Sequence, residues 1–329
     1  MNKNRSIIEL QIFSFLILFF IIWKTNSYII NGSEEIFIKS LINIEVLYPG
    51  YEFQFQGNEE DRKYFRRFNV YFFAYLYDAV NQFILNLKIN NKFLIYFYYS
   101  IISLSLTGGI FFTIACVKKI CNENLYFVWI YILSTSIYIL VVGKLNDGFS
   151  HFEFFLVSAC LYFSMKRKIY LFLLMSFLAI LNRETGILTI FIYYFLNKKN
   201  YKDFILFLIP IIFFFIVNIN FFLSYPYNFT KIIFVSSDIS RVNLINVFDL
   251  DIIKTIGYFS YTFIIYCPLI YCFKKYKIFI NKEHTFLFIL YLIVLNFGTF
   301  IGNIYPQLVI IPFLSIIFFE KKLISKNEY

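Results

Sequence analysis

The stretch "FLAILNRETGILTIF" (Phe177–Phe191) places an arginine and a glutamate side by side within an otherwise apolar segment. A charged side chain at the middle of a membrane helix costs roughly 2.5–3.5 kcal/mol on insertion scales. Apolar sequence continues on both sides as far as Lys168 and Lys198. The segment therefore has to fold so that Arg183 and Glu184 reach protein or water instead of lipid.

The chain as a whole has the composition of a helical membrane protein. Of its 329 residues, 60% are hydrophobic and 23% are aromatic, and the mean hydropathy is +0.69. This predicts an all-α, polytopic integral membrane protein with a single transmembrane domain over residues 1–329 and about ten membrane segments. We expect these segments at 7–23, 93–117, 125–142, 152–165, 169–181, 187–196, 204–223, 255–273, 285–301 and 307–319.

The net charge of +10 follows the pattern of membrane topology. The basic residues lie in short clusters between apolar runs, so we expect no nucleic-acid partner. By the positive-inside rule these clusters are cytoplasmic, as are both termini of this bacterial-type inner or plasma membrane protein. No small-residue cleavage site follows the first apolar run, which favours an uncleaved helix over a signal peptide. The clusters are Lys3/Arg5, Lys118/Lys119, Lys166–Lys168, Lys198/Lys199/Lys202, Lys274/Lys275/Lys277 with Lys282, and Lys321/Lys322/Lys326.

These clusters constrain the fold of residues 169–196. One helix of that length would reach about 42 Å, enough to cross a hydrocarbon core of about 30 Å with a tilt. It would, however, place Lys168 and Lys198 on opposite sides and invert every later cluster. We therefore expect a hairpin of two short helices with its turn at Asn182–Gly186. The charged pair then lies at membrane depth, beside an aqueous cavity open to the outside.

The charged pair has two interpretations. In the functional one, Arg183 binds an anionic substrate group, and Glu184 orients it or takes part in proton transfer. In the structural one, the two side chains satisfy each other and the turn. Adjacent residues do not face each other on a helix, so each side chain is expected to have another partner.

Two long outer loops, 24–92 and 224–254, mix charged and apolar residues, which is typical of helices that lie on a membrane surface. In the first loop, "NGSEEIF" carries Glu34 and Glu35, either of which could act as general base on an acceptor hydroxyl. The alternative is structural, because Ser33 is a good helix N-cap and acids favour a first helical turn.

A second charged group in the first loop is "EEDRKYFRR". Here Asp61 could supply an acid, and Arg66 and Arg67 could form a cationic patch for phosphate. The alternative is a solvated charge run with no ligand.

The stretch "GKLNDGFSHFEF" offers Asp147 as a further catalytic acid. If helix continues through it, Asp147 and His151 share a face. However, "SHFE" matches a capping box with Ser150 as N-cap and Glu153 three residues later. That interpretation accounts for Glu153 and places Asp147 in a loop.

Metal and redox sites have little support in the sequence. The chain has five cysteines without a C-x-x-C pair, and two histidines. We predict neither a metal site nor a disulfide framework. The acidic candidates leave room for a divalent cation, and no other cofactor is expected.

The stretch from Val141 to Lys199 resembles a module of the GT-C superfamily of membrane glycosyltransferases. That module has a G-x-x-D-like loop, a membrane helix, a basic turn, and two short helices joined by a charged turn. Here Gly143–Asp147, Lys166–Lys168 and Asn182–Thr185 stand at those places.

Weaker similarities to the same superfamily lie in the flanking regions. "SEEIFIKSL" is similar to its acidic catalytic loop, with Glu34 where aspartate is usual. "RRFNVYFFAYLY" resembles its R-x-P-x-Y-P-like segment without the prolines. "GNIYPQLVIIPFLSIIFF" resembles its R-Y-x-x-x-x-P segment, with Asn303 near the place of the basic residue.

The resemblance implies a polyprenyl-phosphate-linked sugar as donor, a glycan or glycolipid acceptor, a first-loop acid as base, and cations that hold the lipid phosphate. The nearest alternative is a polysaccharide polymerase or ligase centred on the arginines of the first loop. A transporter or flippase of an anionic lipid-linked substrate would use Arg183 in its pathway, although only one broken segment is evident. A membrane scaffold would need none of the outer acids.

Overall fold

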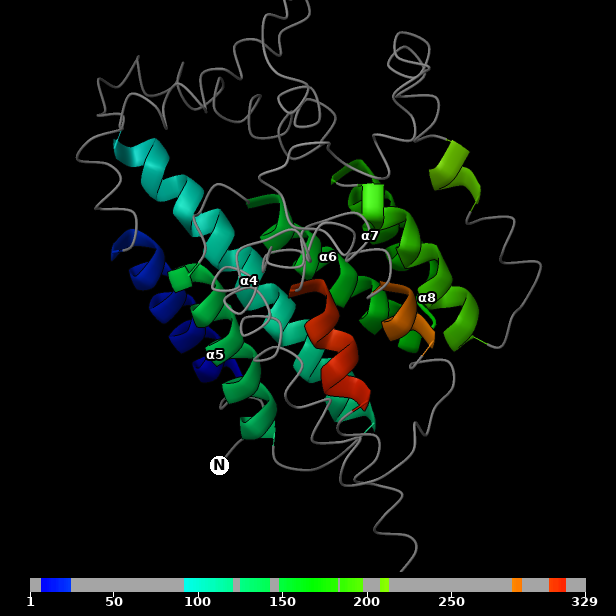
Figure 1. Ribbon diagram of the computed structural model, residues 1–329, viewed down its shortest axis with the longest axis horizontal. Coiled ribbons are helices and arrows are strands. Elements are labelled where there is room, and N and C mark those ends of the chain that lie inside the picture. The colour runs from blue at the N-terminus through cyan, green and yellow to red at the C-terminus, as the bar shows by residue number, and fades with distance from the viewer. Residues whose placement is uncertain are drawn as a thin grey trace, which may run out of the picture.

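The computed structural model describes residues 7–24, 92–120, 125–142, 148–182, 184–197, 208–212, 286–291 and 308–317 (Figure 1). This part of the chain is helical apart from short turns, which confirms the all-α class. Every predicted segment from 7–23 to 187–196 contains a helix. The predicted segment 255–273 and almost all of both long loops lie outside the described residues.

The helices follow one another with short connections through the middle of the chain. They are the N-terminal helix Ile7–Lys24, α4 (Lys92–Ile120), α5 (Leu125–Val142), α6 (Gly148–Met165), α7 (Ile169–Asn182), the 3-10 helix η3 (Glu184–Leu188) and α8 (Thr189–Leu196). Helical segments at 208–212 and 286–291, η6 (Leu308–Ile310) and a helix at 311–317 come later. Among these, Ile7–Lys24 and Tyr99–Ile120 are long and apolar enough to cross a membrane.

Helices α4 and α6 pack closely and run in the same direction. A Cβ atom added to Gly109 would lie less than 3.0 Å from the ring of Phe154. One turn further along both helices, the Thr113 hydroxyl lies 3.4 Å from the Ser158 hydroxyl. Small residues at such contacts let helix backbones approach closely, as they do between helices in membranes. The C-terminal ends of α4 and α6 therefore lie at one end of the bundle (Figure 1).

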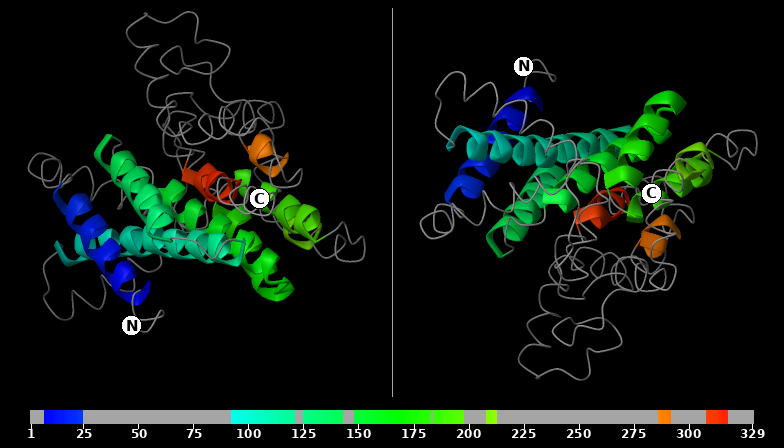
Figure 2. Two further views of the ribbon diagram at one scale, coloured as in Figure 1. Left: turned by 90° about the horizontal axis from the view of Figure 1, so that it is seen from below. Right: turned by 90° about the horizontal axis from the view of Figure 1, so that it is seen from above.

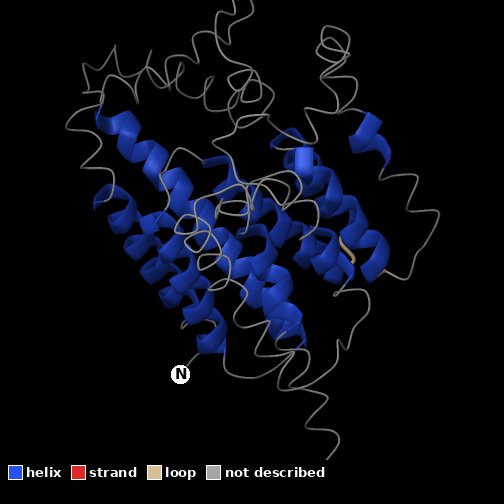
Figure 3. Ribbon diagram, viewed as in Figure 1, coloured by secondary structure: helices blue, strands red, loops and turns tan. Residues whose placement is uncertain are grey.

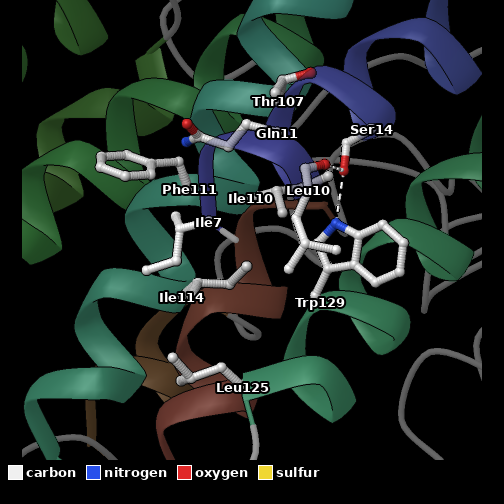
Figure 4. A pocket seen from close by; sticks show the side chains of 10 residues that line it. All are labelled: Ile7, Leu10, Gln11, Ser14, Thr107, Ile110, Phe111, Ile114, Leu125 and Trp129. Carbon is white, nitrogen blue, oxygen red and sulfur yellow. Dashed lines mark hydrogen bonds between the residues drawn. The ribbon is translucent and has the colours of Figure 1, made fainter. Parts of the chain in front are cut away.

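The N-terminal helix runs antiparallel to α4 and also contacts α5 (Figure 2). Its Ser14 hydroxyl accepts a 2.6 Å hydrogen bond from the Trp129 indole, and the Trp23 indole lies 3.4 Å from the Tyr96 hydroxyl. A mainly apolar pocket lies between the three helices (Figure 4). Its lining residues are Ile7, Leu10, Gln11, Ser14, Thr107, Ile110, Phe111, Ile114, Leu125 and Trp129.

Helices α7 and α8 form the predicted antiparallel hairpin against α6. The rings of Phe172 and Tyr193 lie 5.1 Å apart between its arms. Asn197, directly after α8, donates a 3.1 Å hydrogen bond to the hydroxyl of Ser164 at the end of α6. Helix α7 also begins just beyond this end of α6, so the start of α7 and the end of α8 both lie beside the C-terminal end of α6. A single continuous helix over 169–196 is therefore excluded.

The closed end of the hairpin depends on small residues. A Cβ atom on Gly186 would lie less than 3.0 Å from the backbone of Ala179. The hydroxyls of Ser176 and Thr189 are 2.6 Å apart, and Thr189 donates a 2.6 Å hydrogen bond to the Gly186 carbonyl. These contacts bring η3 directly onto the last turns of α7.

The described part of the chain consists of helices and short turns (Figure 3). These helices expose large apolar side chains and bury small polar ones. Phe127 and Phe20 are 66% and 58% exposed, whereas Ser103 and Ser136 are fully buried and donate to carbonyls one turn earlier. Soluble proteins seldom expose large contiguous apolar surface. The exposed apolar side chains and the two long apolar helices are weak evidence for association with a membrane.

Candidate functional site

The structure describes little of the predicted site directly. Seven of the predicted site residues lie outside the described residues: Glu34, Glu35, Asp61, Arg66, Arg67, Asp147 and Arg183. Glu184 is described in its backbone and is the first residue of η3. The surroundings of the charged turn, Asn182–Gly186, are nevertheless defined by the residues beside it.

The backbone on both sides of Arg183 is enclosed by protein. Asn182, the last residue of α7, is fully buried, and Gly186 is buried against α7. Thr185 is half-buried between them. The chain therefore enters and leaves the charged turn at buried positions, Asn182 and Gly186. A charged group buried at such a place would need polar partners.

A buried carboxylic acid lies at this turn. Glu153, on the second turn of α6, has no exposed surface, and its Oε1 accepts a hydrogen bond from the Thr185 hydroxyl. This contact joins the start of α6 to η3, 32 residues later in the chain. A carboxyl group and a hydroxyl thus meet at Thr185, the residue that follows Arg183 and Glu184 in the chain.

The sequence-based interpretation of Glu153 was wrong. Helix α6 begins at Gly148, so Ser150 lies inside its first turn and is not the N-cap. The S-x-x-E spacing is therefore incidental here, and a tertiary contact with Thr185 occupies the carboxyl group. The signal that could have identified Glu153 was an acid within an apolar helix, which is costly unless it is used or paired.

Tyr291 brings the C-terminal part of the chain to the same region. Its side chain is fully buried, lies within electrostatic range of Glu153 and Cys160, and packs on Phe313 with ring centroids 4.9 Å apart. Its hydroxyl makes no hydrogen bond to any residue that the structure describes. Nothing in the sequence distinguished this tyrosine from the other 27.

His151 lies near the start of α6 and is fully buried. Its predicted partner on a shared helix face, Asp147, falls outside the described residues. Within those residues, no three His, Cys, Asp or Glu side chains gather closely enough to hold a metal ion. The predicted acids that could bind a divalent cation, Glu34, Glu35, Asp61 and Asp147, lie outside the described residues.

Two of the six predicted basic clusters, Lys118/Lys119 and Lys166–Lys168, lie at the other end of α6, and the remaining four fall outside the described residues. Lys119, near the end of α4, lies within electrostatic range of Lys166 and Arg167 in the turn between α6 and α7. The part of α6 from Glu153 to Met165, about 18 Å of helix, separates this turn from the contact of Glu153 with Thr185. The described part of the bundle therefore has a basic end, and the contact between Glu153 and Thr185 lies toward the opposite end.

Comparison of the chain with protein-family models, with curated proteins and with solved structures finds no match. The similarity to the GT-C superfamily stays a prediction from the quoted motifs.

Proposed function

We propose that this protein is a multi-pass membrane glycosyltransferase that moves a sugar from a polyprenyl-phosphate donor to a glycan or glycolipid acceptor. The reaction would take place on the outer face of a bacterial-type inner or plasma membrane. Its product would be cell-surface polysaccharide or a modified envelope glycolipid.

A buried carboxylate beside a charged hairpin turn carries this proposal. Glu153 is fully buried, and its Oε1 accepts a hydrogen bond from the hydroxyl of Thr185, which follows Arg183 and Glu184 in the chain. A phosphate leaving group needs fixed positive charge, and charge-assisted hydrogen bonds to phosphate are among the strongest in proteins. A turn held rigidly by α6 is suited to present Arg183 to such a group.

The membrane setting rests on surface composition. Large apolar side chains cover the outer faces of the helices, and two helices have the length and composition of membrane spans. With the basic end in the cytoplasm, the positive-inside rule assigns the charged turn to the outer half of the membrane. A lipid-linked donor needs a site at that boundary, open to lipid on one side and water on the other.

In the proposed reaction, a carboxylate takes the proton of the acceptor hydroxyl as the hydroxyl oxygen attacks the sugar carbon. The bond from that carbon to the lipid phosphate breaks, and the phosphate leaves with the bonding electrons. Arg183 binds the phosphate and Glu184 positions the arginine, with Arg66 and Arg67 as further cations. The candidates for the base are Glu34, Glu35, Asp61 and Asp147.

The test is sugar transfer from a polyprenyl-phosphate donor by purified protein carrying one substitution at a time. The variants are E34Q, E35Q, D61N, R66Q, R67Q, D147N, R183Q, E184Q and E153Q. The matched control is E9Q, which removes an exposed carboxyl on the N-terminal helix. Each variant is first checked for wild-type abundance in membranes, so that a loss of transfer reports on the reaction.

We expect one acid variant and R183Q to lose at least 100-fold in turnover, in line with general acid–base and electrostatic contributions. A transporter would depend on Arg183 but tolerate all the first-loop acid variants. A scaffold would tolerate every substitution. Either pattern would overturn the proposal, whereas dependence on Arg66 and Arg67 alone would favour a polymerase or ligase.

A further inference from the structure

The basic end of the bundle gathers cations from two separate elements. Lys119 comes from α4, and Lys166 and Arg167 come from the turn between α6 and α7, which lies 47 positions further along the chain. All three side chains are exposed, and so is Lys168. Among the described residues, no carboxylate acts on Lys119, whereas two cations do. Like charges held together in this way repel each other unless an anion lies between them.

In the turn after α6, Arg167 occupies a backbone conformation in which another residue type would be expected. Arg167 has φ of 54°, a left-handed conformation that favours glycine. Its amide donates to the Ser164 carbonyl at 2.9 Å, and the Lys168 amide donates to the Phe163 carbonyl at 3.0 Å. These two bonds form a Schellman motif, in which the left-handed position is usually glycine. A charged side chain therefore stands where the backbone alone would favour none.

Exposed apolar side chains continue directly from this basic turn. On the first turns of α7, Tyr170 is 85% exposed, Leu171 43% and Leu174 51%. Positions 170 and 174, and 171 and 174, are neighbours on one helical face. A cationic group followed by an aromatic and aliphatic face matches a ligand that has an anionic head and an apolar tail. Neither free phosphate nor an acidic soluble peptide would use both parts.

We propose that Lys119, Lys166 and Arg167 bind the headgroup phosphate of an anionic membrane phospholipid, whose acyl chain lies along Tyr170, Leu171 and Leu174. The positive-inside rule alone requires only positive charge on one side of the membrane. The proposed site additionally requires these particular cations, and a lipid that has both a net negative charge and an acyl chain.

The test is titration of the full-length protein in mild detergent, followed by native mass spectrometry. The probes are phosphatidylglycerol, phosphatidylcholine, diacylglycerol and inorganic phosphate. We expect phosphatidylglycerol to bind at least tenfold more tightly than phosphatidylcholine, and diacylglycerol not to bind. Inorganic phosphate at the same concentration should not displace the bound lipid. Equal retention of the two phospholipids, or displacement by inorganic phosphate, would overturn the assignment to an anionic lipid.

The variants separate charge from folding. R167G removes the cation at a position that glycine fits, so the helix end should stay intact, while R167K keeps the charge. We expect R167G and K119Q each to weaken phosphatidylglycerol binding about fivefold, as one cation near a membrane surface does. R167K should bind as the wild type does, and so should K24Q, which removes an exposed lysine at the opposite end. If R167G and R167K bind equally, or if K24Q weakens binding as much as K119Q, the site does not exist.

Discussion

At the scale of single residues, Glu153 is a fully buried acid that accepts a hydrogen bond from the hydroxyl of Thr185, which is distant in the sequence. A buried polar group left without its partner costs more than a hydrogen bond gains, because its desolvation is no longer offset. The Thr185 hydroxyl should therefore be more important for stability than an ordinary half-exposed threonine.

Replacing Thr185 with valine keeps the shape of the side chain and removes the donor. We expect T185V to lower the free energy of unfolding by about 1–3 kcal/mol, because the buried carboxyl group loses a partner. T185S keeps the hydroxyl and should stay within about 1 kcal/mol of the wild type. Thermal unfolding of the purified protein in detergent measures both. Equal midpoints for T185V and T185S would show that the hydrogen bond does not contribute.

The sequence showed that Glu153 is an acid within an apolar helix and so needs a partner, but it did not show which residue the partner is. Its S-x-x-E spacing is a local signal, whereas its actual contact is with Thr185, 32 residues away. Such a contact depends on how two helices and a turn pack, which no local pattern contains. Helix α6 also begins earlier than the motif implied, at Gly148 rather than after Ser150.

At the scale of elements, the hairpin of α7, η3 and α8 closes through the contact of Gly186 with the α7 backbone. Any side chain at Gly186 would collide with Ala179 main-chain atoms, which cannot rotate away. At Gly108, by contrast, an added Cβ atom would lie 2.6 Å from the ring of Phe155, which is able to shift. The two glycines therefore form a matched pair for mutation.

We expect G186A to cost about 3 kcal/mol, because η3 and α7 must separate to accommodate the methyl group. G108A should cost about 1 kcal/mol, because a side chain can move instead. Fluorescence-detected size exclusion after heating gives the two unfolding midpoints. A G186A protein as stable as G108A would mean that the turn does not pack against α7 as described.

The hairpin could be predicted because the basic clusters on its two sides decided between two folds that the segment length allowed. Segment length alone allowed one long helix over 169–196, and the position of the basic clusters on either side decided against it. The hydrogen bond from Asn197 to Ser164 bears this out. Helical periodicity could not have decided the matter, since both arms are apolar nearly all round and show no distinct polar face.

At the scale of the whole molecule, the directions of the helices show at which of the two ends of the bundle each described helix begins and finishes. The ends of α4 and α6 lie together, whereas Lys24 closes the N-terminal helix next to Tyr96, near the start of α4. The two long loops, 24–92 and 224–254, were predicted from mixed composition alone. Composition can favour a membrane surface for such loops, but it does not specify where in the fold their acids lie.

Single cysteines in an otherwise cysteine-free protein test these directions. Cysteines at Lys119, Arg167 and Asn197 should react with an impermeant thiol reagent from one side of intact vesicles, because their helix ends lie together. A cysteine at Lys24 should react only from the other side. The measurement is the fraction labelled before and after the vesicles are opened. Labelling of positions 167 and 197 from opposite sides would contradict the hairpin and the proposed location of Arg183.

The short arms of the hairpin have a consequence for biosynthesis. Helix α7 has 14 residues and α8 has 8, so they extend about 21 Å and 12 Å, and neither can bridge a hydrocarbon core of about 30 Å unaided. In the proposed membrane setting, the insertion machinery would have no complete span to recognise in either arm. Both arms should therefore partition into the bilayer only after α6 is already there to receive them, which makes the order of synthesis, N-terminal half first, a condition for correct assembly.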